Sequence, residues 1–480
     1  MSVLRDVIDE AVRSRLQDLQ RLQRAGLVCL DGDFVPAVHY PAITAYPRTT
    51  ADELFAGYAP PRDGLFDVYV HIPFCEKACV FCHYPVKLGE RPAEKDGYLT
   101  ALEREMDLTM ARLGLATIKA RSILVGGGTP TYLTPAQHER FLRAFTRRLD
   151  LAACTQFNYD VDPATIIGPD GARRLEVMRA HGVDRLTIGV QSLADDLLAR
   201  MNRPHGVAQA LESITAALAA GFKVNIEFIF GYPGQTMATW IETIEHAVRL
   251  GVGEIQLYRL KIIPYGDKTG RILARYAARA GDFVTLEQTM AMKQAAHCIL
   301  EAHGYHENLS RVFSKAPQDF SHYADNQCCK LRDQLGFGLT AFSSLRDRFA
   351  LNTLSFPEYY AAIAAGRLPL TRGLRRSRED QIRWSLILPL KNRDVHKPAY
   401  ERRAGIALGR VFGPQIARLK AHGLVVEDET TLKLTPVGRF FADEVAQLFY
   451  RPGVIPFPRE AYAAGELSPY ADPDLHEVEA

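Results

Sequence analysis

The stretch that decides the fold is Tyr69-Val-His-Ile-Pro-Phe-Cys75-Glu-Lys-Ala-Cys79-Val-Phe-Cys82-His-Tyr84, in which three cysteines follow the spacing C-x3-C-x2-C. Loops this short allow successive thiolates to turn toward one iron–sulfur cube. Such cubes normally take four cysteine thiolates, and no fourth cysteine lies nearby. One iron would therefore keep an open position, as a catalytic zinc does for its substrate.

The alternative for these cysteines is a zinc site that lacks one ligand, with His71 or His83 as the fourth. Zinc sites usually pair their cysteines as C-x2-C. The wider first gap and the aromatic Phe81 before the last cysteine fit that pattern poorly. The spacing therefore favours a cluster over zinc.

The composition is that of an ordinary globular protein. At 480 residues the chain is long enough for one large domain with appendages, or for two to three domains. A formal charge of +2 gives no reason to expect nucleic acid or an anionic membrane as a partner. No apolar run approaches the ~18 residues that a membrane span needs, and residues 1–27 lack the apolar core of a secretory signal. Eight cysteines, clustered rather than spread, indicate a reducing compartment, so we expect a cytoplasmic protein.

Short strand patterns alternate with helical patterns from residue 66 onward, which predicts an α/β fold with a parallel sheet. The spacing of these units favours a partial (β/α)6 barrel of the TIM type. The expected strands are 67–71, 122–125, 157–161, 185–190, 224–230 and 254–260. The expected helices between them are 95–112, 135–148, 170–181, 206–220 and 236–250.

The flanking segments look different from the barrel. We expect an amphipathic helix over 2–25 and an extended arm to residue 66, then the barrel domain over 67–360. Helical patterns at 378–388 and 410–421 precede a hairpin pattern at 423–434, which predicts a winged-helix-like module over 361–450. The proline-rich tail over 451–480 is expected to be irregular.

Polar and glycine residues follow several expected strands, at the end of the barrel where chemistry gathers. Gly126-Gly-Gly-Thr129 offers bare backbone to a polar ligand. Asp160 and Asp162 can accept hydrogen bonds from ribose hydroxyls or an ammonium group, and Gln191 ends the fourth strand. Each of these residues alone could equally have a structural role. Because all of them follow strands of the same parallel sheet, their shared position favours a binding site.

Other charged and thiol groups remain as candidates. Arg203 can pair with a carboxylate, and Glu227 lies in an apolar strand where an unpaired charge is costly. Arg259 and Lys261 add positive charge to the expected cavity. The adjacent Cys328 and Cys329 point apart; we interpret them as thiols without a metal, with a second redox pair or cluster ligation as the alternative.

With these motifs, the chain resembles the radical S-adenosylmethionine (SAM) superfamily, in particular its oxygen-independent coproporphyrinogen III oxidase-like branch. The resemblance rests on motifs that run through nearly the whole chain. They are Tyr69-Val-His-Ile-Pro-Phe-Cys, Gly-Gly-Gly-Thr-Pro-Thr-Tyr-Leu133, Asp160-Val-Asp-Pro, Gly189-Val-Gln-Ser, Gly231-Tyr-Pro-Gly-Gln-Thr236, Leu335-Gly-Phe-Gly338 and the arm segment Tyr40-Pro-Ala-Ile-Thr-Ala-Tyr-Pro47.

The resemblance implies that Cys75, Cys79 and Cys82 hold a 4Fe–4S cluster whose open iron binds SAM, and that reductive cleavage yields a 5′-deoxyadenosyl radical. It implies two SAM molecules and a reductant such as flavodoxin or ferredoxin as partner. The residues that it places around SAM are Tyr69, Gly127, Gly128, Thr129, Asp160, Gln191, Arg203 and Glu227. The family carries Glu at the position of Asp160 and Asp at the position of Glu227.

One departure shapes the expected reaction. The oxidase proper has a further cysteine at the position of Tyr84, and Asn326-Gln-Cys-Cys is closer to the heme-chaperone-like relatives. Relatives with an aromatic residue at the Tyr84 position include the class C methyltransferases and cyclopropanating enzymes of natural-product pathways, and heme-modifying enzymes. We therefore expect a small organic substrate that is modified by methyl transfer or carbon–carbon bond formation with the second SAM. The alternatives are oxidative decarboxylation of a tetrapyrrole and a heme chaperone of the same family.

Overall fold

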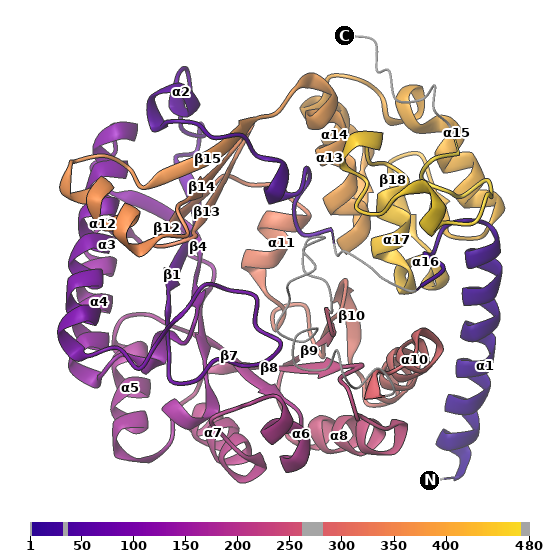
Figure 1. Cartoon of the computed structure of the whole chain (residues 1–480), viewed down its shortest axis with the longest axis horizontal. Helices are drawn as coiled ribbons and strands as arrows, with labels where there is room; N and C mark the ends of the chain where they lie inside the picture. Colours follow the sequence, from indigo (N-terminus) through magenta and orange to yellow (C-terminus); the bar gives the residue numbers. More distant parts are fainter. Residues whose placement is uncertain (1, 32–36, 262–281, 472–480) are drawn as a thin grey trace.

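A computed structural model describes residues 2–31, 37–261 and 282–471 of the chain. Its centre is a mixed sheet in which the six expected strands run parallel, in the order β1-β4-β6-β7-β8-β9 (Figure 1). Their bounds are β1 Leu65–Ile72, β4 Ile118–Gly127, β6 Phe157–Val161, β7 Arg185–Gln191, β8 Lys223–Phe230 and β9 Glu254–Arg259. The predicted α/β partial barrel is confirmed.

The sheet extends at both edges beyond these strands. Beside β1 lies β12, also parallel, and an antiparallel run of three strands continues from it. An antiparallel hairpin lies on the far side of β9. The added strands are β12 Gln334–Phe337, β13 Phe342–Leu345, β14 Arg348–Asn352, β15 Leu370–Arg375, β10 His306–Leu309 and β11 Val312–Ser314; the short pieces are β2 Phe74–Cys75, β3 Lys87–Leu88 and β5 Leu149–Asp150.

The helices that follow the strands cover the sheet with apolar faces. Thr134 and Gln137 form a capping box at the start of α4, and Phe141 and Phe145 of that helix are buried. The helices of the barrel region are α3 Pro92–Leu113, α4 Pro135–Thr146, α5 Gly168–Ala180, α6 Asp195–Arg200, α7 Val207–Ala219, α8 Met237–Arg249, α10 Leu286–Ala302, α11 His322–Cys328 and α12 Phe356–Ala364, with 3-10 turns η2 Pro130–Tyr132 and η3 Pro163–Thr165.

The N-terminal helix α1, Ser2–Arg24, lies beside α10 and buries Leu19 and Leu22 against the C-terminal module (Figure 1). The arm that follows is not extended throughout. It contains η1, Ile43–Ala45, and α2, Ala51–Phe55, which begins with a capping box of Thr50 and Glu53. This corrects the expected arm, because the pattern T-x-x-E already marks a helix start.

The C-terminal module has five helices and a small sheet in the order β16-β18-β17, and it shares its apolar core with α1 and the arm. The expected hairpin is present as β17 and β18. The elements are α13 Arg378–Asn392, β16 Asp394–His396, α14 Lys397–Ala404, α15 Leu408–Ala421, β17 Val425–Glu427, β18 Thr431–Leu434, α16 Pro436–Phe440, α17 Ala442–Gln447, η6 Pro452–Val454 and η7 Arg459–Ala461. The tail from residue 451 to 471 has only these two 3-10 turns.

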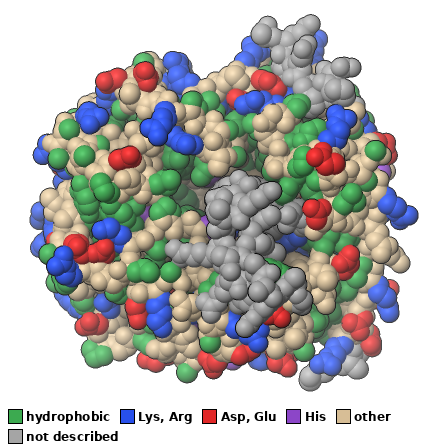
Figure 2. Space-filling model, viewed as in Figure 1, with side chains coloured by type: hydrophobic (Ala, Val, Ile, Leu, Met, Phe, Trp, Pro, Cys, Tyr) green, Lys and Arg blue, Asp and Glu red, His purple; other side chains and the backbone are tan. Residues whose placement is uncertain are grey.

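The surface carries charges of both signs. Lys and Arg side chains alternate with Asp and Glu around the edge of the face drawn in Figure 2. Among the helices of the described ranges, none combines the length and the apolar character that crossing a membrane would require.

Candidate active site

The cysteine loop lies at the carboxyl end of β1, beside the ends of the neighbouring parallel strands. Cys75 ends β2, and all three cysteines are half-buried and form no disulfide. The loop is tied to the segment after α6, since the Val80 amide donates to the Met201 carbonyl at 3.0 Å. The Asn202 side chain also donates to the Ala78 carbonyl at 2.8 Å. One distant segment of the chain, residues 201–202, therefore holds the loop in place.

Arg203 connects the cysteine loop to the ends of β6 and β7. Its Nη1 lies 3.1 Å from the Cys79 sulfur, and its Nη2 donates to Asp162 at 2.6 Å and to the Gly189 carbonyl at 2.8 Å. Burial alone would raise the pKa of Asp162, but the charge of Arg203 and the hydrogen bond with His205 outweigh it, so the pKa lies below its usual value. An ionised Asp162 thus holds the cation of Arg203 against the Cys79 sulfur.

The glycine run at the end of β4 packs directly on the cysteine loop. Gly127 has φ +112°, and a Cβ there would lie 2.8 Å from the His71 ring. A Cβ on Gly128 would lie 3.0 Å from the Cys75 sulfur and 2.8 Å from the Phe74 carbonyl oxygen. The Thr129 hydroxyl donates to the same sulfur at 3.5 Å. The glycines therefore serve close approach of the chain to itself, and their contact with a ligand stays a prediction.

Tyr69, within β1, and Gln191, at the end of β7, are two further residues that we predicted to contact SAM. The Tyr69 hydroxyl lies 3.0 Å from His71 Nδ1. Gln191 is buried and has φ +69°, a left-handed conformation that is uncommon outside glycine and concentrates at functional sites. From the sequence, His71 was considered only as an alternative zinc ligand. Burial lowers its pKa to about 4, so the ring is neutral where it packs against the glycine run. Its position in the sequence between Tyr69 and Cys75 could have indicated that His71 lies in the site.

These residues suit the iron–sulfur cluster and SAM that the motifs imply. Three sulfur donors lie on one loop, with a guanidinium and a hydroxyl directed at two of them. Among the described residues, no group of three or more His, Cys, Asp or Glu side chains is placed to hold a single metal ion. A cubic cluster asks for a different arrangement, because each thiolate binds its own iron. Cys75, Cys79 and Cys82 would hold the cluster.

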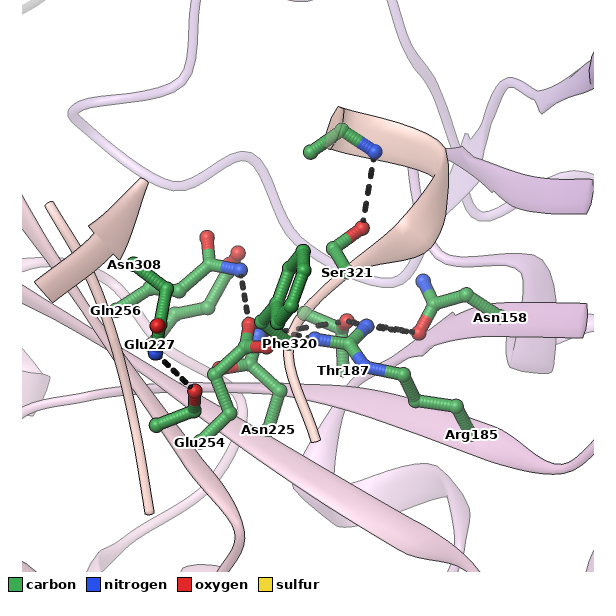
Figure 3. Close-up of polar contacts among 12 residues, drawn as sticks. Asn158, Arg185, Thr187, Asn225, Glu227, Glu254, Gln256, Asn308, Phe320 and Ser321 are labelled. Carbon is green, nitrogen blue, oxygen red and sulfur yellow. Dashed lines mark hydrogen bonds and ion pairs between the residues drawn. The ribbon is translucent and has the colours of Figure 1, made fainter. Parts of the chain in front are cut away.

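A chain of buried polar groups lies on the neighbouring strands β6 to β9, and Figure 3 shows its part from Asn158 to Gln256. Arg185 donates to Glu254 at 2.6 Å, and the Gln256 amide nitrogen donates to the same carboxylate oxygen at 2.6 Å. The remaining oxygen of Gln256 lies 2.6 Å from the Tyr258 hydroxyl, which is 3.1 Å from a Glu227 carboxyl oxygen. The chain therefore runs from a buried ion pair to Glu227 within β8.

Burial and the direction of these hydrogen bonds together act on the protonation of Glu227. A tyrosine hydroxyl has one proton, and the shorter contact, to an oxygen of Gln256 that can only accept, takes it. Glu227 then faces a lone pair on Tyr258, which favours its neutral form. Burial raises the pKa of Glu227 to about 7 and that of nearby Asp160 to about 8. Asp160 accepts a hydrogen bond from Asn158 at 3.1 Å, which favours its charged form.

Cys328 and Cys329 lie at the end of α11, outside the cysteine loop. The two residues before them anchor this helix to β1, since Asn326 and Gln327 each donate to Asp67 at 2.9 Å. Both thiols are free, and burial raises both pKa values. Their interpretation as thiols without a metal stays a prediction.

Comparison with known proteins gives two family matches. Residues 69–247 match the radical SAM superfamily, and residues 377–441 match the HemN C-terminal domain. The heme chaperone HemW of Bacillus subtilis is 29% identical over 387 residues, covering 79% of this chain and 98% of that protein. The oxygen-independent coproporphyrinogen III oxidase of Escherichia coli is 28% identical over 398 residues, covering 80% and 84%. The solved structure of HemN, the coproporphyrinogen III oxidase of Escherichia coli, is similar with a TM-score of 0.69 and 26% identity, covering 82% and 90% of the two chains.

Proposed function

The chain belongs to the radical SAM superfamily, in its oxygen-independent coproporphyrinogen III oxidase-like branch, and from this membership we propose that it oxidises a tetrapyrrole that carries carboxylate side chains. The observation that carries this proposal is the similarity to the solved oxidase over 82% of the chain, beyond the barrel alone. The relatives favour this reaction over methyl transfer or carbon–carbon bond formation, which find no specific support among them.

The residues at the barrel rim suit this chemistry. Cys75, Cys79 and Cys82 would hold the cluster, and the loop contacts keep the three thiols together. Arg203 keeps positive charge beside one thiolate, and Asp162 fixes the direction of that guanidinium. When bound, the cluster and SAM supply the radical that removes a hydrogen atom from the substrate.

The other predicted SAM contacts are Tyr69, Gly127, Gly128, Thr129, Asp160, Gln191 and Glu227. Gly127 and Gln191 end their strands, whereas Tyr69 and Glu227 lie within β1 and β8. A second SAM and a small protein reductant, flavodoxin or ferredoxin, remain part of the proposal. Each propionate side chain that loses a hydrogen atom and CO2 also releases one electron, which the oxidised form of such a protein could take up, and a second SAM would serve a second propionate.

A heme chaperone is the second candidate. The similarity to HemW extends over 98% of that protein. Tyr84 stands where the oxidase proper has a cysteine, and its side chain is 56% exposed beside His71, with ring centroids 6.2 Å apart. An exposed aromatic ring at the mouth of the site suits stacking against a flat macrocycle in either function.

Anaerobic turnover separates the candidates. The protein is reconstituted with iron and sulfide and incubated with coproporphyrinogen III, SAM and a reductant. The proposal expects 5′-deoxyadenosine together with a tetrapyrrole that has lost CO2 and two hydrogens. Stoichiometric heme binding without 5′-deoxyadenosine would favour the chaperone. S-adenosylhomocysteine with an unchanged number of carboxylates would instead indicate methyl transfer and overturn the proposal.

A further inference from the structure

Arg311 occupies an unusual position in the turn between β10 and β11. Its backbone has φ +65°, a left-handed conformation that costs free energy for a residue with a side chain. Its amide donates to the Glu307 carboxylate at 2.6 Å, and its carbonyl accepts from the Leu257 amide at 3.0 Å. The preceding Ser310 amide donates to the Asn392 carbonyl at 3.0 Å. Contacts from three elements thus hold one arginine in a strained conformation.

The guanidinium of Arg311 lies over the Tyr258 ring, 5.2 Å from its centroid. Arg185 and Arg203 are each bound to a carboxylate at 2.6 Å. Within the part of the chain that the structure describes, Arg311 has no such ion pair, and its guanidinium donates no hydrogen bond to a protein group. A half-buried guanidinium with five N–H donors is suited to bind a planar acid.

The charge of Arg311 interacts with titratable groups on several surrounding elements. It acts on Glu227 of β8, on Cys328 of α11, on Asp443 of α17, and on two lysines, Lys261 after β9 and Lys391 of α13. Lys391 forms an ion pair with Asp443 at 3.0 Å. Arg311 therefore lies among groups of β8, α11 and the C-terminal module, and the cations Lys261 and Lys391 lie in the same region.

We propose that Arg311 binds a carboxylate side chain of the substrate, with Lys261 strengthening the positive field, and so selects tetrapyrroles that carry acidic groups. This inference rests on the proposed function and names a substrate-binding residue for it. The backbone contacts fix the position of the Arg311 main chain, and its guanidinium packs over the Tyr258 ring. A guanidinium held in this way binds a carboxylate with two parallel hydrogen bonds, which a lysine cannot do.

Equilibrium binding to the reconstituted protein tests the proposal, with coproporphyrin III as the acidic probe and its uncharged tetra-amide as the matched neutral probe. The variants are Arg311→Gln and Arg311→Lys. The control is Arg174→Gln, because Arg174 is also half-buried and donates only to backbone carbonyls, of Leu133 and Thr165. Thermal unfolding of each variant checks that the fold is kept.

We expect Arg311→Gln to weaken binding of the acid by at least about tenfold, the scale of one charge-assisted hydrogen-bonded pair, and Arg311→Lys to weaken it less. Binding of the amide should be equal in all variants. Equal weakening of both probes, or acid binding as tight as in the Arg174→Gln control, overturns the role of Arg311 while leaving the proposed function in place. Failure of the unaltered protein to bind coproporphyrin overturns both.

Discussion

Replacing Tyr258 by phenylalanine tests the direction of the hydrogen-bond chain inside the barrel. In the structure the Tyr258 hydroxyl is shared between Gln256 at 2.6 Å and Glu227 at 3.1 Å. If its proton goes to Gln256, the Tyr258 oxygen accepts a hydrogen bond from neutral Glu227. Tyr258→Phe removes that acceptor, so the pKa of Glu227 should fall.

The expected size follows from the strength of one hydrogen bond. A typical intramolecular hydrogen bond contributes ~1 kcal/mol, and one pKa unit corresponds to ~1.4 kcal/mol. The pKa of Glu227 should therefore fall by slightly less than one unit from its value of about 7. If Tyr258 instead donates to an ionised Glu227, the same substitution removes a bond to the charged form and the pKa rises.

Carbon-13 NMR of protein labelled at the glutamate carboxyl carbons measures this shift, with the Glu227 signal assigned from Glu227→Gln. The control is Tyr305→Phe, which removes a buried hydroxyl that donates to the Val252 carbonyl at 2.7 Å, away from Glu227. A rise in the Glu227 pKa in Tyr258→Phe would refute the reasoning, and so would an unchanged value.

The same protonation makes stability depend on pH. The pKa of Glu227 is raised from 4.5 to about 7 on folding, so the folded state binds the proton more tightly than the unfolded chain. Protonation of Glu227 therefore adds ~3 kcal/mol to the free energy of unfolding below about pH 4.5. This contribution is lost as the pH rises through about 7. In Glu227→Gln the free energy of unfolding should fall less than in the unaltered protein as the pH rises through this range. Urea unfolding at several pH values measures this difference.

Three further substitutions have defined outcomes. Cys79→Ser should retain far less iron and sulfide after anaerobic reconstitution than Cys154→Ser, and equal iron contents would contradict the cluster assignment. Arg185→Met leaves the Glu254 carboxylate buried without its partner, so urea unfolding should show a loss of about 3–5 kcal/mol; a loss under ~1 kcal/mol would contradict it. Gly128→Ala forces a Cβ within 3.0 Å of the Cys75 sulfur and should cost about 1–3 kcal/mol and lower the iron content. Gly97→Ala, in an open helix position, should be neutral or stabilising, and similar losses in the two alanine variants would refute the packing argument.

Local patterns were sufficient for the elements of the barrel. Strand and helix periods reflect which side chains face the core, and this information lies within a few residues. Because the strands are parallel, their ends meet at one edge, so Asp160, Asp162 and Gln191 could be assigned to the same rim as the cysteines. The helix α2 was missed although Thr50 and Glu53 carry its start signal.

The sequence by itself determined the three thiols, the parallel strands and the rim on which the candidate site lies, because spacing and periodicity are local properties. Only the tertiary structure decided which groups meet across that rim. Arg203 binds Asp162 and Cys79, which are 41 and 124 positions away, and β12 pairs with β1 from a distant part of the chain. Such pairings depend on how whole elements pack, and short-range patterns carry no record of them.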